Sequence, residues 1–122
     1  MGGSTVTTER GFGAIIRGLR EDRQIGLRQF ARMLGMSATY LSKIEREELP
    51  PPAEERVKEI ARLLERDPDE LLALAGKVAS DLNEIIRTQP REMALLLRTA
   101  RGSSGHKLKQ LTEQAKGING KK

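Results

Sequence analysis

A helical stretch near the middle of the chain carries small, hydroxyl-bearing and basic side chains where a core helix would carry large apolar ones. The stretch is SATYLSKIER, residues 37–46, and helical spacing places Leu41 and Ile44 together on its inward face. A methyl group can contact thymine, a hydroxyl can donate or accept a hydrogen bond, and a lysine can reach the O6 and N7 atoms of guanine. The outward face carries Ala38, Thr39, Ser42, Lys43 and Arg46. This pattern predicts a helix that reads bases in the major groove of DNA, which is about 12 Å wide.

The distribution of charge favours a polyanionic partner. The chain of 122 residues has a formal net charge of +5. Residues 10–47 carry eight Lys and Arg against four Asp and Glu, residues 48–76 carry four against eight, and residues 77–122 carry ten against four. Two basic segments therefore flank an acidic one, and a nucleic acid or an acidic membrane surface is the usual partner of basic segments.

Several classes of function lack the residues that they require. Because the chain has no cysteine, disulfides and thiolate chemistry are excluded, and a reducing cytoplasm is the expected compartment. No apolar run reaches the roughly 18–20 residues that cross a bilayer, so no membrane partner is expected. His106 has no cysteine or acidic cluster beside it, and no nucleophile–base pair is recognisable. We therefore expect no metal, no cofactor and no enzyme activity.

Helical spacing of apolar residues runs through the whole chain and predicts an all-α fold. Gly35 suits the left-handed turn that ends a helix, Ser37 suits a hydroxyl cap, and Asp67–Pro68 suits a cap followed by proline at the first helical position. Three prolines at 50–52 enforce an extended break. The predicted helices are 10–22, 27–34, 38–46, 53–65, a fifth that ends at Gly76, a sixth that Ser80 caps and Pro90 ends, 91–101 and a short eighth at 107–116.

These elements divide the chain into four segments. The second helix, the turn at Gly35 and the third helix have the size and spacing of a helix-turn-helix, although an ordinary helical hairpin is the alternative. Gly11-Phe12-Gly13 lacks the remaining residues of a phosphate-binding loop, so we interpret it as a frayed helix start. The segments are a disordered arm at 1–9, a helix-turn-helix domain at 10–76, a helical extension at 77–101, and a linker with a basic tail at 102–122.

Residues 26–46, GLRQFARMLGMSATYLSKIER, resemble the phage-repressor and Cro type of helix-turn-helix, the XRE family of bacterial and phage regulators. The resemblance extends over about residues 10–76 and includes Phe30-Ala31, the turn at Gly35, the SKIER ending and DPDELL at 67–72. It implies an all-α, five-helix, DNA-binding domain with additional C-terminal helices. It also implies base contacts from Ala38, Thr39, Ser42 and Lys43, phosphate contacts from Arg28, Gln29, Ser37, Tyr40 and Arg46, and a structural ion pair between Arg20 and Glu45.

Three positions depart from the pattern of that family. Gly26 replaces the usual Ser or Thr cap, which weakens the cap by only a few tenths of a kcal/mol. Leu27 replaces a glutamine that binds phosphate in many relatives. Glu47 replaces a glycine after the third helix, which costs about 1 kcal/mol where the backbone is left-handed. With Glu48 it places negative charge near the expected DNA backbone, and we expect this charge to weaken nonspecific binding.

The sequence therefore predicts a sequence-specific transcriptional regulator, a repressor that binds a palindromic operator in double-stranded DNA as a homodimer. The sixth and seventh helices could instead extend the core of the first five. A second hypothesis is an antitoxin or adaptor that binds a toxin or a protease through these helices, and a third is nonspecific nucleic-acid binding through the basic tail. The expected dimer or partner interface is Leu82, Ile85, Ile86, Met93, Leu96 and Leu97.

Overall fold

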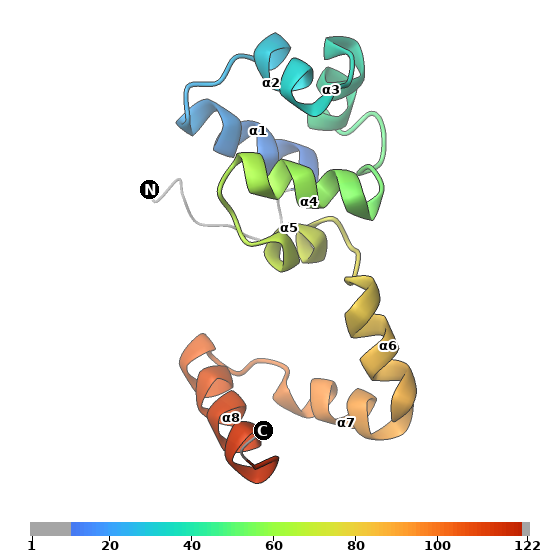
Figure 1. Ribbon diagram of the computed structural model, residues 1–122, viewed down its shortest axis with the longest axis vertical. Helices are drawn as coiled ribbons and strands as arrows, with labels where there is room; N and C mark the ends of the chain where they lie inside the picture. Colours follow the sequence, from blue (N-terminus) through green and yellow to red (C-terminus); the bar gives the residue numbers. More distant parts are fainter. Residues whose placement is uncertain (1–10, 121–122) are drawn as a thin grey trace. The chain divides into compact units, whose positions relative to one another are not determined.

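The computed structural model describes residues 11–120, and within this range the regular structure is entirely helical. The predicted all-α fold is confirmed. The arm predicted at 1–9 lies outside the described residues. In chain order the helices are α1 (Phe12–Asp22), α2 (Leu27–Leu34), α3 (Ala38–Glu45), α4 (Glu54–Leu63), α5 (Pro68–Leu74), α6 (Ser80–Thr88), α7 (Pro90–Ala100) and α8 (Gly105–Ile118) (Figure 1).

The helices α1 to α5 share one hydrophobic core in the first of two compact units, which we call the N-terminal unit, described residues 11–80. Helices α1 and α2 both pack against α3, and α4 packs against α2 and α5. Figure 1 shows α2 and α3 side by side. Ala79 belongs to this core at 4% exposure, so the unit extends past the boundary predicted at Gly76. The largest fully buried side chains are Phe30, Ile16, Leu34, Leu41, Ile44, Ile60, Leu64, Leu71, Leu72 and Val57.

The turn between α2 and α3 has the geometry that its residues predict. Gly35 is left-handed, with φ of 67°, and the N–H of Met36 donates to the carbonyl of Ala31 at 3.0 Å. Ser37 is extended, and its hydroxyl accepts the N–H of Tyr40 at 3.0 Å. The left-handed glycine satisfies the last carbonyls of α2, and the serine satisfies a free N–H of α3. Both predictions are confirmed, and together they fix the direction of α3 relative to α2.

Three helices of the N-terminal unit end on a left-handed residue that is not glycine. Gln24, Glu47 and Glu65 have φ of 58°, 62° and 57°. Each follows the C-cap of its helix, and in each case the next residue donates its N–H back to a carbonyl in the last turn. This is the hydrogen-bond pattern that normally uses glycine, because a Cβ atom is disfavoured at positive φ. The left-handed backbone considered for Glu47 is therefore present.

The prediction of a frayed start for α1 is wrong. Phe12 is 5% exposed, Gly13 is buried, and both lie against the end of α3 rather than in solvent. The N–H of Ala14 donates to Oε2 of Glu47 at 3.1 Å. This contact could not be predicted from local sequence patterns, because its two partners are separated by 33 positions.

The second compact unit, which we call the C-terminal unit, comprises the described residues 81–120 and contains α7, α8 and all but the first residue of α6. None of its described residues, 81–120, is buried. Helix α8 is longer at both ends than predicted, because the hydroxyl of Ser104 accepts the N–H of Lys107 at 3.1 Å and caps it. The disordered tail expected from Gly117 is thus wrong for that residue and for Ile118.

The predicted N-cap role of Ser80 is also wrong. Ser80 is the first residue of α6, and its N–H and hydroxyl both donate to Oε2 of Glu54, at 3.3 and 3.4 Å. Glu54 is the first residue of α4, so this contact joins the end of the N-terminal unit to the beginning of α4. The cap of α5 follows the prediction, with the Asp67 carboxylate accepting the N–H of Asp69 at 2.8 Å.

Candidate nucleic-acid interface

The face of α3 that points away from the core is the surface where the sequence predicts base contacts. Leu41 and Ile44 are 0% and 1% exposed, which fixes the inward side of the helix. On the other side Thr39 and Lys43 are exposed, whereas Ala38 and Ser42 are half-buried. Helix α3 therefore presents a short polar face that is small at Ala38, Thr39 and Ser42, so that its backbone can approach a partner closely.

Helix α3 is fastened to α1 by a buried ion pair between Arg20 and Glu45. The Arg20 Nε and Nη2 atoms donate to the two carboxylate oxygens of Glu45 at 2.8 and 2.9 Å. The third nitrogen, Nη1, donates to the carbonyl of Ile25 at 2.8 Å. The two charged residues are 7% and 6% exposed. The hydrogen bond to Glu45 raises the pKa of Arg20. The two parallel bonds make the pairing bidentate, and this form fixes the orientation of the two side chains.

The residues for which phosphate contacts are expected lie on the surface around α3. Arg28 and Gln29 are exposed on the first turn of α2, and Tyr40 is 38% exposed. Among residues 11–120, neither Arg28 nor Lys43 has an acidic partner. The Ser37 hydroxyl accepts a bond as a cap and keeps its own proton available to donate. These groups can therefore meet an anion without first breaking an ion pair.

Arg46 differs from these residues because it is already engaged. Its Nη1 lies 2.9 Å from Oε2 of Glu48, and its Nε donates to the hydroxyl of Ser42 at 3.2 Å. The side chains of Arg46 and Glu48 are 51% and 50% exposed. An exposed pair of this kind contributes about 0–1 kcal/mol, so a phosphate oxygen can replace Glu48 at little cost. Glu48 is paired with Arg46 in the free protein, but a phosphate that takes its place leaves the carboxylate unpaired, so the repulsion of DNA expected from the sequence remains.

A shallow hollow of about 270 Å³ places Arg17, which the sequence did not single out, on the surface that carries the expected phosphate contacts. It is lined by Arg17, Arg20, Leu27, Ser42, Glu45 and Arg46, from α1, α2 and the outer side of α3. Arg17 is exposed and pairs with Glu21 one turn later at 3.2 Å. The start of α2 at this hollow has no side-chain cap, because Gly26 is its N-cap. Free N–H groups at a helix start favour an anion. The position of Arg17, one turn before Arg20, is the sequence feature from which its place in this hollow could have been predicted.

The apolar residues predicted for a dimer or partner interface remain uncovered. Leu82, Ile85, Leu96 and Leu97 are 38–55% exposed, and Ile86 and Met93 are half-buried. Four further apolar residues of the C-terminal unit, absent from the predicted interface, are exposed: Leu95, Leu108, Leu111 and Ile118.

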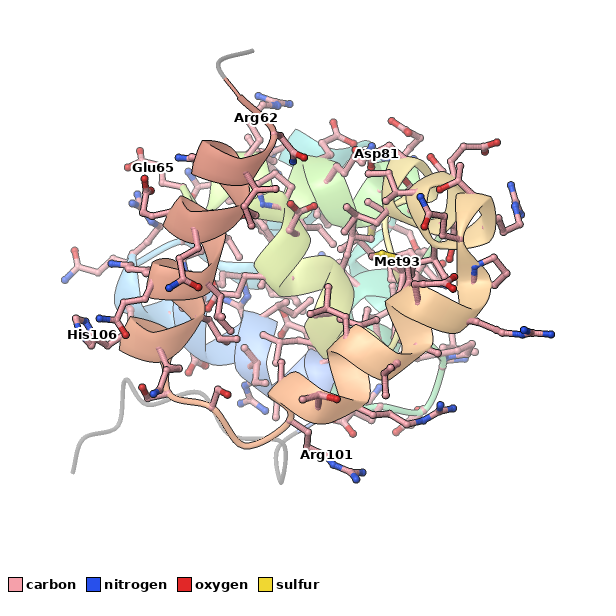
Figure 2. The ribbon with its side chains drawn as sticks, turned by 90° about the horizontal axis from the view of Figure 1, so that it is seen from below. Arg62, Glu65, Asp81, Met93, Arg101 and His106 are labelled. Carbon is pink, nitrogen blue, oxygen red and sulfur yellow. The ribbon has the colours of Figure 1, made fainter. Side chains whose placement is uncertain are left out.

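Other kinds of site find little support within residues 11–120. This range contains no group of three or more His, Cys, Asp and Glu placed to hold a metal ion. His106 lies in the first turn of α8 with its ring directed outward (Figure 2). No helix in this range is long and apolar enough to cross a membrane.

Comparison with known proteins decides the family. A family model described as "Helix-turn-helix domain", of the XRE type, matches residues 12–74, which include α1 to α5. The chain belongs to the XRE-type helix-turn-helix family. Members of this family are DNA-binding regulators. The resemblance that the motifs indicated is thereby confirmed, and the alternative of an ordinary helical hairpin is excluded.

Solved structures give further comparisons for this XRE-type chain. The clp gene regulator ClgR from C. glutamicum is 25% identical, over 59% of this chain and 92% of its own, with a TM-score of 0.47. A second ClgR structure, from Corynebacterium glutamicum, is 21% identical over 79% and 96%, with a TM-score of 0.48. A SinR protein/SinI protein complex is 22% identical over 90% and 99%, with a TM-score of 0.48. The search of curated protein sequences gave no significant match.

Proposed function

We propose that this XRE-type protein is a transcriptional repressor that binds a palindromic operator as a homodimer, with α3 of each copy in the major groove. The observation that carries the proposal is the outward face of α3, where Thr39 and Lys43 are exposed on a helix held by a buried ion pair. In a dimeric helix-turn-helix protein the two recognition helices enter successive major grooves, about 34–36 Å apart. A protein seated there blocks access of polymerase to the promoter.

Each residue around α3 has a proposed role. Thr39 and Lys43 contact base edges, and Ala38 and Ser42 complete the face that meets the groove floor. Arg28, Gln29, Ser37, Tyr40 and Arg46 contact phosphates, which position the protein without reading sequence. Arg17 joins this second group because it lines the same hollow as Arg46.

Dimerisation is proposed to occur through the C-terminal unit. Its described residues include no buried side chain, so the three helices have no closed core of their own. Helix α7 carries large apolar residues on more than one side, because Leu95 points away from the side shared by Met93, Leu96 and Leu97 in helical spacing. A helix that is apolar on several sides is normally enclosed between neighbours. A second copy would supply the missing cover and would also double the number of phosphate contacts.

The experiment that tests this proposal is selection from a randomised pool of DNA duplexes by the purified full-length protein at two salt concentrations. A palindromic motif that survives at the higher salt is expected, and Lys43→Ala should change the preferred base at one position in each half-site. Arg62→Ala is the matched control, because it removes the same charge from an exposed position on α4 (Figure 2). Binding that disappears with salt and leaves no motif would contradict sequence-specific repression.

A second function is favoured by the exposed apolar residues of α7 and α8, which could bind another protein. In this alternative the chain is an antitoxin or adaptor whose C-terminal helices hold a toxin or a protease. The solution mass separates the two. A homodimer that selects a DNA motif supports the repressor, whereas a monomer that forms a complex only with a purified candidate toxin or protease supports the adaptor.

A further inference from the structure

Glu47, the residue that follows the C-cap of α3, has a backbone conformation that is unfavourable for a residue with a Cβ atom. Glu47 has φ of 62°, its N–H donates to the carbonyl of Ile44 at 3.0 Å, and the N–H of Glu48 donates to the carbonyl of Lys43 at 2.8 Å. This pair of bonds ends α3 in the motif that normally uses glycine. A glutamate at that position carries a conformational cost. A favourable contact of its side chain could offset this cost.

The Glu47 carboxylate lies at the start of α1. Its Oε2 accepts the N–H of Ala14, the third residue of that helix, at 3.1 Å. The N-cap of α1 is Gly11, which has no side chain to perform this task. A negative charge at a helix start is favoured both by the free N–H groups and by the helix dipole. Glu47 therefore supplies from the end of α3 the cap that α1 lacks.

Two glycines at the start of α1, the N-cap Gly11 and Gly13, make this approach possible. A Cβ atom on Gly11 would lie 2.1 Å from both carboxylate oxygens of Glu47. A Cβ atom on Gly13 would lie 2.1 Å from the carbonyl oxygen of Ile44 and 2.8 Å from that of Glu45. Such distances are far below van der Waals contact. The first turn of α1 thus lies directly on the last turn of α3. A larger side chain at Gly13 would meet backbone and separate the two helices, whereas one at Gly11 would displace the Glu47 carboxylate.

We propose that Glu47 is a positioning residue for DNA recognition, which holds the C-terminal end of α3 against α1 so that Lys43 and Arg46 keep their direction. The inference rests on the proposed function, because it concerns the aim of the recognition helix. It also changes the role of this glutamate from that expected on charge alone. The carboxylate is directed to the positive end of α1, so its effect on DNA binding is mechanical rather than repulsive.

The chain contains a matched control for this proposal. Glu65 ends α4 with φ of 57°, and it is followed by the same pair of backbone bonds, from Glu65 to Arg62 and from Arg66 to Ala61. Its carboxylate meets Arg23 at 2.8 Å with the glutamate side chain 72% exposed. Within residues 11–120 it accepts no N–H at the start of a helix. Replacing each glutamate by alanine removes the same charge at the same backbone conformation. Glu47→Ala loses a cap of α1, whereas Glu65→Ala loses only an exposed ion pair with Arg23.

The test uses full-length Glu47→Ala, Glu47→Gln and Glu65→Ala, each first shown by thermal unfolding to be folded at the assay temperature. Hydrogen exchange of the Ala14 amide should accelerate in Glu47→Ala and stay unchanged in Glu65→Ala. Affinity of Glu47→Ala for the selected operator should fall by about fivefold, which is the strength of a typical cap, while affinity of Glu65→Ala stays within about twofold. Glu47→Gln keeps an oxygen acceptor and should lie between the wild type and Glu47→Ala.

Opposite results would overturn the inference. If Glu47→Ala binds the operator as tightly as Glu65→Ala, the carboxylate does not position α3. If both Glu47 variants bind more tightly and the gain disappears at high salt, Glu47 acts only by repelling phosphates. If the wild-type protein selects no DNA motif, the proposed function itself fails and the inference fails with it, which differs visibly from the first two results.

Discussion

Arg20 on α1 and Glu45 on α3 form a bidentate ion pair, with Nε to Oε2 at 2.8 Å and Nη2 to Oε1 at 2.9 Å, and both residues are almost fully buried. The remaining Arg20 nitrogen binds the carbonyl of Ile25 in the loop that leads to α2. One guanidinium therefore ties together three parts of the helix-turn-helix unit. The pair fixes how α3 sits on the domain that carries it.

Removing one partner of this pair should be strongly destabilising. Arg20→Met leaves the Glu45 carboxylate buried without its cation, and we expect a loss of about 3 kcal/mol in the free energy of unfolding. The matched control is Arg17→Met, which breaks an exposed pair with Glu21 on the same helix and should cost under about 0.5 kcal/mol. Urea unfolding of both variants measures the difference, and equal losses would contradict a structural role for the buried pair.

The two interior glycines of α1 should respond in opposite ways to alanine. Gly13→Ala places a Cβ atom 2.1 Å from the backbone carbonyl of Ile44, so the helices must separate, at a cost of about 1–3 kcal/mol or more. Gly18→Ala meets no atom within 4 Å and should stabilise the helix by about 0.5–1 kcal/mol. Thermal unfolding would show the two midpoints moving apart. A Gly13→Ala protein as stable as the wild type would contradict the close packing of α1 on α3.

Glu54 should make stability depend on pH in the acid range. Hydrogen bonds from the Lys58 ammonium and from the Ser80 backbone N–H hold the pKa of Glu54 below its usual value. Since the folded-state pKa is the lower one, its contribution is present at neutral pH and is lost as the pH falls through that pKa. Between about pH 5 and pH 3, the unfolding midpoint of Glu54→Gln should therefore fall less steeply than that of the wild type. Glu55→Gln, with a side chain 86% exposed, is the control and should follow the wild type.

Base and phosphate contacts should separate in their response to sequence and salt. Lys43→Ala should cost about 1–3 kcal/mol on the selected operator and little on random DNA, because its contact reads a base. Arg28→Ala should weaken binding to both DNAs alike and lower the salt slope by about 0.9, the value for one phosphate. Titrations at four salt concentrations measure both effects. Identical behaviour of the two variants would show that one of these roles is misassigned.

A charge within the apolar face of α7 should break the proposed homodimer. Leu97 is 55% exposed, and Leu97→Asp would require an interface to bury a carboxylate without a partner. We expect the solution mass to fall to that of one chain and operator binding to lose its dependence on paired half-sites. Val78→Asp, at a residue 46% exposed in the N-terminal unit, should keep the dimer mass. Light scattering distinguishes these outcomes, and a dimer that survives Leu97→Asp would locate the interface elsewhere.

The features that could be predicted from sequence are those that depend on residues close together in the chain. The spacing of Leu27, Phe30 and Leu34 marks one face of α2, and Gly35 and Ser37 mark the turn through backbone conformation and capping that act within three or four positions. The Arg20–Glu45 pair is distant in sequence and could be inferred only through resemblance to a family. Periodicity alone does not specify which charged residues meet.

The features that could not be predicted depend on tertiary contact. Glu47 has an unfavourable backbone conformation when viewed alone, and its benefit appears only when α1 is packed beside it. Ser80 has the side chain of an N-cap, but its hydroxyl donates a hydrogen bond to Glu54 at the start of α4 instead. Arg17 resembles any exposed helical arginine until the hollow beside Arg46 is seen.

The left-handed residues at the ends of α1, α3 and α4 also bear on how the protein could be altered. Gln24 and Glu65 occupy positions where glycine would relieve backbone strain, and both lie outside the face of α3 that carries recognition. Substitution by glycine at these two positions could therefore stabilise the fold without changing DNA specificity. Glu47 is the exception among the three, since the same exchange there would relax the backbone and release the recognition helix together. Variation in this protein is thus expected to be free at two of its helix ends and restrained at the third.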